Sequence, residues 1–153
     1  MVFWVGIAEG KLMFIPRKPT PLGFMLKTIV DTESGILVNA EIVEGAEEDA
    51  SKEYNEQWGK STGCTLRLTK PWHGKSRIII GDSWFGSYRC AVALLKHGCF
   101  TVANVKTGHK HFPKKVLKGL VKKRGDTHHM KIIVPGMENE ATNEVYGSIH
   151  LDA

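Results

Sequence analysis

The chain has 153 residues, a formal net charge of +5 and an isoelectric point near 9.1. This length predicts one domain with a modest core, and 42% hydrophobic with 24% charged residues is typical of a soluble globular protein. No apolar run is long enough for a membrane helix and the N-terminus does not resemble a signal peptide, so we expect no membrane association and an intracellular protein that is not secreted.

The first part of the chain predicts an antiparallel hairpin. A short strand is expected at residues 11–15, and the three prolines of residues 16–21 predict an extended, non-helical segment. Strands are then expected at residues 24–30 and 36–43, joined by turn residues 31–35. Alternation places one set of apolar residues on a single face of the second strand, namely Ile36, Val38, Ala40 and Ile42.

The middle of the chain predicts two helices and then a strand. The first helix is expected at residues 46–58, and the second is capped by Ser61 and runs to Thr69, where Pro71 prevents its continuation. Three consecutive isoleucines in residues 76–81 predict a strand that is buried on both faces.

After Asp82 the apolar period becomes helical up to Gly98, and residues 99–105 form the next strand, which completes a βαβ unit. A helix at residues 113–120 and a strand at residues 127–134 follow. This order predicts an α/β fold with a mixed sheet and flanking helices. The ribonuclease-H-like fold is one of several architectures with that order.

Charge is distributed unevenly along the chain. Residues 41–56 carry seven acids and one base, whereas residues 106–124 carry eight bases and no acid. We expect one negative and one positive surface, and a phosphate backbone is the natural ligand of the positive one. The alternative is a solvated helix face and a basic loop.

Cysteine usage argues against a disulfide framework or a zinc knuckle. The chain has three cysteines and no Cys-x-x-Cys pair, so we expect free, mostly buried thiols in Cys64, Cys90 and Cys99. His109 and His111 would point to the same side of a strand, as at the start of a zinc site, but no further ligands accompany them.

Asp82 is the best candidate for chemistry. It lies at the C-terminal end of the isoleucine strand, where α/β proteins place their sites. A carboxylate there can bind a divalent cation, and nucleic-acid strand chemistry commonly uses two cations held by several carboxylates. The alternative is an Asp that caps a helix starting at Ser83 or Trp84. Trp84 and Phe85 can stack on a flipped base or, alternatively, pack behind the Asp82 loop.

Residues 82–87, Asp-Ser-Trp-Phe-Gly-Ser, resemble the Asp-x-Trp-Phe-x-Ser signature of piggyBac transposases and their domesticated derivatives. Further segments resemble the same family in the same order, so the resemblance runs from about Phe14 to Leu117. These segments are residues 15–19, 21–23, 31–35, 65–68, 72–74, 105–110 and 112–113.

The resemblance implies a single, partial catalytic-core domain over residues 1–153, with a ribonuclease-H-like fold and a nuclear location. In the family, three Asp carboxylates bind Mg²⁺ for hydrolysis and transesterification of DNA. Asp82 matches the second of the three and is therefore the expected catalytic and metal-binding residue. By spacing, the first falls just upstream of Met1 and the third well beyond Ala153.

We therefore expect a fragment of a piggyBac-like DDE transposase, an enzyme of DNA transposition by ancestry that is inactive as given and binds Mg²⁺ weakly or not at all. The alternatives are a domesticated DNA-binding module without catalysis and a non-functional relic. In the binding alternative DNA is the partner, and the expected contacts are Arg17, Lys18, Lys106, Lys110, Lys114 and Lys115.

Overall fold

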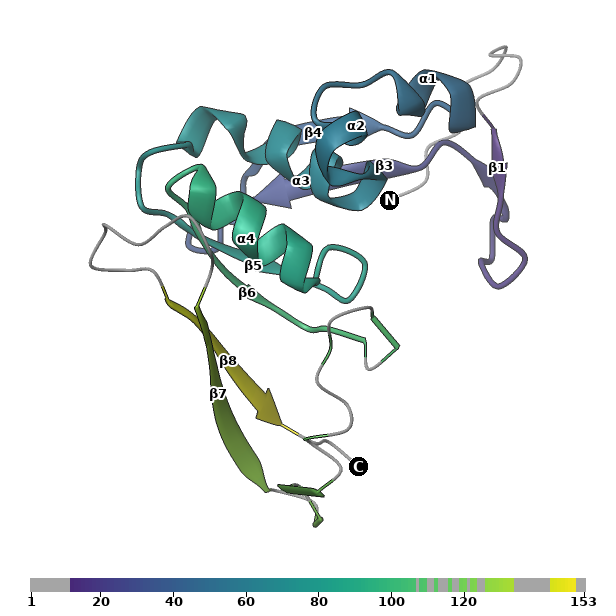
Figure 1. Cartoon of the computed structure of the whole chain (residues 1–153). Coiled ribbons are helices and arrows are strands. Elements are labelled where there is room, and N and C mark those ends of the chain that lie inside the picture. The colour runs from purple at the N-terminus through teal and green to yellow at the C-terminus, as the bar shows by residue number, and fades with distance from the viewer. Residues whose placement is uncertain are drawn as a thin grey trace.

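The described part of the chain is mixed α/β, with several helices and four small sheets (Figure 1). The predicted mixed sheet is divided, in the described part, into four two-stranded sheets, of which three are antiparallel and one is parallel. No helix within that part is long and apolar enough to cross a membrane. The structure is a computed structural model that describes residues 12–106, 108–109, 112, 116, 119–120, 122–123, 126–133 and 144–150.

The first sheet is a small hairpin of β1 (Met13–Phe14) and β2 (Leu22–Gly23). The proline-rich segment between them contains no helix, but the expectation that it is extended is wrong. The N–H of Ile15 donates to the carbonyl of Pro21 at 2.8 Å, and the N–H of Lys18 donates to the carbonyl of Ile15 at 3.0 Å. These bonds turn the chain back on itself.

The second sheet is the predicted hairpin of β3 (Leu26–Val30) and β4 (Leu37–Ile42). Its turn is confirmed, because one carboxylate oxygen of Asp31 accepts hydrogen bonds from the N–H and the hydroxyl of Ser34, at 2.8 and 2.6 Å. Gly35 has a φ of +69°, which a side chain would disfavour.

The alternation predicted for β4 is present, but its apolar face is exposed in the described structure. The opposite face carries Asn39 and Glu41, which are half-buried. The side-chain amide of Asn39 donates to the carbonyl of Leu68 at 3.1 Å, which ties β4 to α3 (Lys60–Thr69). Polar contacts, and not the apolar stripe, therefore fix this strand to the helix.

The single acidic helix predicted from the sequence is instead two short helices, α1 (Ala46–Ala50) and α2 (Asn55–Trp58). Tyr54, between them, has a φ of +69°, which interrupts a right-handed helix. Arg67 of α3 donates to the side-chain oxygen of Asn55 at 2.9 Å, so a tertiary contact stabilises the break.

Helix α3 begins at Lys60, so Ser61 does not cap it as predicted. The hydroxyl of Ser61 instead donates to the carbonyl of Trp84 at 2.6 Å. The helix ends at Thr69, as predicted, and continues into the 3₁₀ turn η1 (Lys70–Trp72), which contains Pro71.

The third sheet confirms the predicted βαβ unit. Strands β5 (Ile78–Gly81) and β6 (Phe100–Ala103) pair in parallel and are joined by α4 (Tyr88–Lys96). The helix starts at Tyr88 because the hydroxyl of Ser87 caps it by accepting the N–H of Cys90 at 3.0 Å.

The prediction that the isoleucine strand is buried on both faces is wrong for the described structure. Ile79 packs against the core, whereas Ile78 and Ile80 are 64% and 67% exposed. Phe100 and Val102 of β6 are exposed as well. Among the described elements, helices cover only one face of this sheet, so its other apolar face meets solvent.

The core lies between α3, α4 and the βαβ sheet. The three cysteines are free and buried, as predicted. Burial raises the pKa of the Cys64 thiol to about 12, which keeps it protonated and unreactive. The buried core cluster consists of Leu66, Cys90, Ala93, Leu94 and Cys99.

The helix predicted at residues 113–120 lies largely outside the described residues, and the three of its members that are described as helical are too few to define it. Strand β7 (Thr127–Ile133) confirms the strand predicted there. It pairs with β8 (Glu144–His150), a strand that the sequence pattern does not predict, and Figure 1 shows this hairpin projecting away from the helices.

Candidate functional site

Asp82 follows β5 directly, and its side chain is exposed. One carboxylate oxygen accepts the N–H of Trp84 at 2.8 Å, and the Asp82 carbonyl accepts the N–H groups of Phe85 and Gly86 at 3.1 and 2.9 Å. Residues 82–86 therefore form a tight turn and not the start of a helix capped by Asp82, as the alternative prediction had it. The next helix, α4, begins at Tyr88. Among the described residues the second carboxylate oxygen accepts no hydrogen bond, so it is available to a ligand.

Gly86 allows this turn to pack against the end of β6. A Cβ added at Gly86 would overlap the carbonyl oxygen of Asn104 and lie 3.1 Å from the Cβ of Ala103. The N–H of Asn104 in turn donates to the carbonyl of Gly81 at 3.3 Å. The position of Asp82 thus depends on a close approach of two backbone segments that only glycine permits.

Trp84 and Phe85 pack together, which favours the packing interpretation over stacking on a flipped base. Their rings lie 4.7 Å apart at 80°, and both side chains are half-buried. The Nζ atom of Lys27 lies 3.6 Å from the Trp84 ring centroid and covers one face of the indole. That face is therefore closed to a base.

Lys27 is a site residue that the sequence reasoning missed. It lies on β3, and its side chain reaches the Asp82 turn from a different sheet. Burial lowers the pKa of Lys27, while the nearby carboxylate of Asp82 acts in the opposite direction. A signal was present in the strand pattern, because Lys27 shares a face with Met25 and Ile29 and a lysine on an apolar face is unusual.

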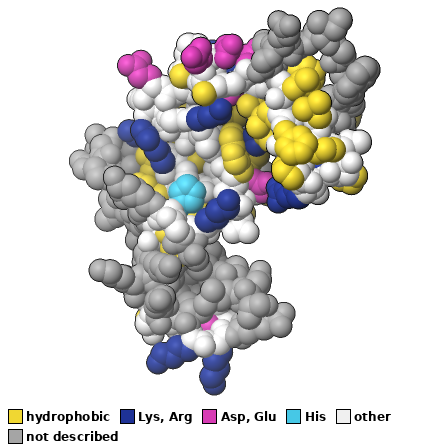
Figure 2. All heavy atoms as spheres, turned by 90° about the vertical axis from the view of Figure 1, so that its right-hand side faces the viewer, with side chains coloured by type: hydrophobic (Ala, Val, Ile, Leu, Met, Phe, Trp, Pro, Cys, Tyr) yellow, Lys and Arg dark blue, Asp and Glu magenta, His cyan; other side chains and the backbone are white. Residues whose placement is uncertain are grey.

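The residues predicted to contact DNA are only partly within the described structure. Arg17 and Lys18 are exposed in the β1–β2 loop, and Lys106 is exposed after β6. Figure 2 shows Lys and Arg side chains at several separate places on one face of the molecule. Three further predicted contacts lie outside the described residues, namely Lys110, Lys114 and Lys115.

The acidic segment contains structural ion pairs rather than only solvated side chains. Lys52 lies 2.8 Å from Asp49 and 3.1 Å from Glu44, and Lys60 lies 2.5 Å from Asp49. Burial acts to raise the pKa of Asp49, but hydrogen bonds from Lys52 and Lys60 outweigh it and lower the pKa to about 2. These acids therefore hold α1 and α3 together.

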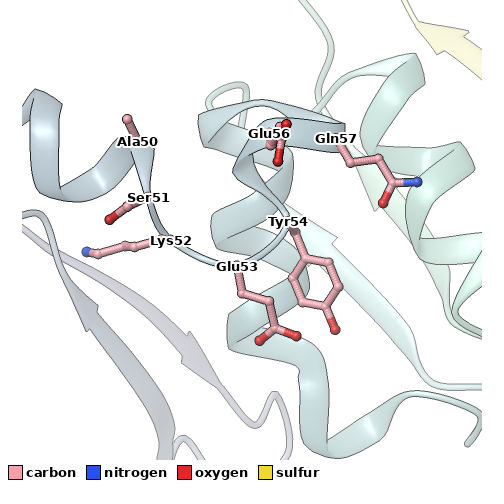
Figure 3. A pocket seen from close by; sticks show the side chains of 7 residues that line it. All are labelled: Ala50, Ser51, Lys52, Glu53, Tyr54, Glu56 and Gln57. Atoms are coloured by element: carbon pink, nitrogen blue, oxygen red, sulfur yellow. The ribbon is translucent and has the colours of Figure 1, made fainter.

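A hollow of about 550 Å³ lies over the break between α1 and α2 (Figure 3). One continuous stretch of chain lines it, and Figure 3 shows Glu53 and Tyr54 pointing to the same side of that stretch. Glu53 is already paired with Lys70 at 2.7 Å. None of the predicted site residues lines this hollow. We therefore assign the candidate site to Asp82 and not to the hollow.

The described residues alone do not fit a complete magnesium site. They contain no group of three or more His, Cys, Asp or Glu side chains placed to hold a metal ion. Mg²⁺ is usually held in proteins by one or two carboxylates together with water and substrate phosphates, so Asp82 alone would bind it weakly. His109 is exposed, and its predicted partner His111 lies outside the described residues.

Comparison with known proteins shows the family to which the chain belongs. Residues 10–139 match the model of a family described as transposase IS4. A cryo-EM structure of a piggyBac transposase synaptic complex with hairpin DNA is similar in fold, with a TM-score of 0.62 and 24% sequence identity. The likeness covers 80% of this chain and 25% of that chain, so this chain spans about a quarter of that transposase. No curated protein matches.

Proposed function

Because the chain belongs to the transposase IS4 family, we propose that it is part of the catalytic core of a piggyBac-like DDE transposase. The observation that carries this proposal is Asp82, whose exposed carboxylate stands at the C-terminal end of a parallel strand inside the matched region. That is the place where α/β proteins present ligand-binding side chains. Residues 1–153 would form a single, partial domain.

A ribonuclease-H-like arrangement is part of the proposal. Residues from β3 (Thr28, Ile29) and from β5 (Ile79, Ile80) line the same small, mostly apolar pocket of about 40 Å³. The two sheets do not pair with each other in the described structure. We propose that they are two parts of one sheet, and that a further strand carrying the first carboxylate of the family lies between them.

Asp82 would contribute one carboxylate to a Mg²⁺ site that other residues of the family's domain complete. A metal ion held there, with Asp82 as one of its ligands, would supply the positive charge that phosphodiester chemistry requires. We propose that this chain by itself does not cut DNA, because its described residues supply too few ligands. DNA contact without catalysis is the second candidate function, and it is favoured by the exposure of Arg17, Lys18 and Lys106.

The metal role of Asp82 can be tested without an activity assay. Tb³⁺ binds oxygen ligands as Mg²⁺ does, and the indole of Trp84 lies close enough to sensitise its luminescence. We expect a weak signal that Mg²⁺ competes away and that Asp82→Asn abolishes, whereas the control Asp31→Asn, in the hairpin turn, keeps it. A signal that survives Asp82→Asn would remove Asp82 from the site.

Catalysis is tested separately on supercoiled DNA with Mg²⁺. The expected result is that neither the chain nor its Asp82→Asn variant nicks the plasmid. Nicking by the chain that is abolished by Asp82→Asn would show that it is an active enzyme as given. Salt-sensitive binding to duplex DNA without nicking would support the second candidate function.

A further inference from the structure

Lys27 has an unusual environment for a lysine. Its side chain is half-buried on β3 and lies over the indole of Trp84, beside the Asp82 turn. Within the described part of the chain Lys27 forms no ion pair with a carboxylate. Lys52, Lys60 and Lys70 each form at least one. Its charge is therefore only partly offset by the carboxylate of Asp82. Glu41 is its partner across the β3–β4 ladder, but the carboxylate of Glu41 is bonded to Arg67.

Packing alone does not account for a charged residue at this position. Burying an ammonium group costs free energy unless a partner is present, and a methionine would cover the indole without that cost. A cation–π contact recovers part of the cost. A positive charge beside the exposed carboxylate of Asp82 would reduce the repulsion between that carboxylate and an anionic ligand that approaches it.

We propose that Lys27 binds a phosphate of a DNA strand that enters the Asp82 site. This inference rests on the proposed function, and it adds a DNA-contacting residue that lies at the candidate site rather than on the basic loops. An ammonium group with three donors suits a phosphate oxygen, and the Trp84 ring and β3 hold it in place. The phosphate would otherwise be repelled by Asp82.

The chain offers a matched control for this lysine. Lys96 lies at the last turn of α4 with its Nζ atom 5.7 Å from the ring of Trp58, so it too is a lysine above a tryptophan. It is at the far end of the helix that follows the Asp82 turn, roughly 13 Å along the axis. Lys27→Met and Lys96→Met therefore remove the same charge and the same kind of contact.

The test is binding of a short labelled DNA duplex to the full chain at a series of salt concentrations. Lys27→Met should weaken binding about five- to tenfold at low salt and reduce the slope of log K against log salt by about 0.9, because one phosphate contact is lost. Lys27→Arg, which keeps the charge, should restore most of the affinity, and Lys96→Met should change neither quantity.

Equal effects of Lys27→Met and Lys96→Met would overturn the inference while leaving DNA binding by the chain intact. Absence of salt-dependent binding by the unaltered chain would overturn both the inference and the second candidate function. If Lys27→Met does not fold, acetylation of lysines in the unaltered chain, read by mass spectrometry, decides the matter. DNA should protect Lys27 and leave Lys96 unchanged, and equal reactivity of Lys27 with and without DNA would overturn the inference.

Discussion

The guanidinium group of Arg67 on α3 forms two hydrogen bonds, each 2.7 Å long, with the carboxylate of Glu41 on β4. Both side chains are largely shielded from solvent, and the pair joins a helix of the core to the hairpin sheet. The bond to Glu41 raises the pKa of Arg67, so the guanidinium group keeps its charge.

Removing this pair should destabilise the fold. Arg67→Met leaves the shielded carboxylate of Glu41 with only Lys52, at 3.6 Å, and also removes the bond to Asn55. We therefore expect the free energy of unfolding to fall by about 2–3 kcal/mol. Urea denaturation measures the change. Lys70→Met, which removes the exposed pair with Glu53, is the control and should have a much smaller effect. Equal effects would show that the Arg67–Glu41 pair does not hold the hairpin.

The close approach at the Asp82 turn leads to a second prediction. Gly86→Ala places a methyl group on the carbonyl oxygen of Asn104, so we expect a loss of about 1–3 kcal/mol in the free energy of unfolding. Gly108→Ala is the control, because nothing lies within 4 Å of the added methyl group. Thermal unfolding compares the two. An unchanged melting temperature for Gly86→Ala would mean that the turn moves without cost.

The βαβ unit could be predicted because its signals are local. An apolar run, a helical period ending at Gly98 and a second apolar run are enough to give β5, α4 and β6. The break between α1 and α2 could not be predicted in this way. It depends on Arg67, which lies beyond the break in sequence and reaches back to it.

Only the part of the candidate site that has a local sequence signal could be predicted. Asp82 could be identified from its place after a strand, whereas its neighbour Lys27 comes from another sheet and is brought there by tertiary packing. The exposure of Ile78 and Ile80 could not be foreseen, because three consecutive isoleucines fit a strand covered on one face or on both.

His73 should make stability depend on pH. Its ring lies 4.6 Å from that of His97, and burial, followed by the charges of His97 and Lys70, lowers the pKa of His73 below its ordinary value of 6.5. Glu53 acts in the opposite direction but more weakly. The unfolded chain therefore takes up the proton at a higher pH than the folded chain does.

Stability should accordingly fall as the pH drops below 6.5 and level off once the folded state is also protonated. The urea midpoint of the unaltered chain should decrease between about pH 7.5 and pH 5.5. His73→Asn should reduce this decrease. If both proteins lose stability equally over the interval, the dependence arises from other groups.

The exposed face of the βαβ sheet leads to the last prediction. Ile78, Ile80, Phe100 and Val102 form an apolar surface that should bind hydrophobic dyes and promote association. Ile80→Thr should reduce dye fluorescence and light scattering with little change in the free energy of unfolding, because Ile80 is 67% exposed.

The neighbouring residue provides the control. Ile79 lies on the opposite face and packs against the core, so Ile79→Thr should lower the free energy of unfolding by about 1–3 kcal/mol and increase association. Light scattering at equal protein concentration and urea unfolding measure both effects. Opposite signs for Ile79→Thr and Ile80→Thr in scattering would establish that the two faces of β5 have different roles. Matching losses of stability would instead show that the face bearing Ile80 is covered in solution, as it would be if further structure packed on this sheet.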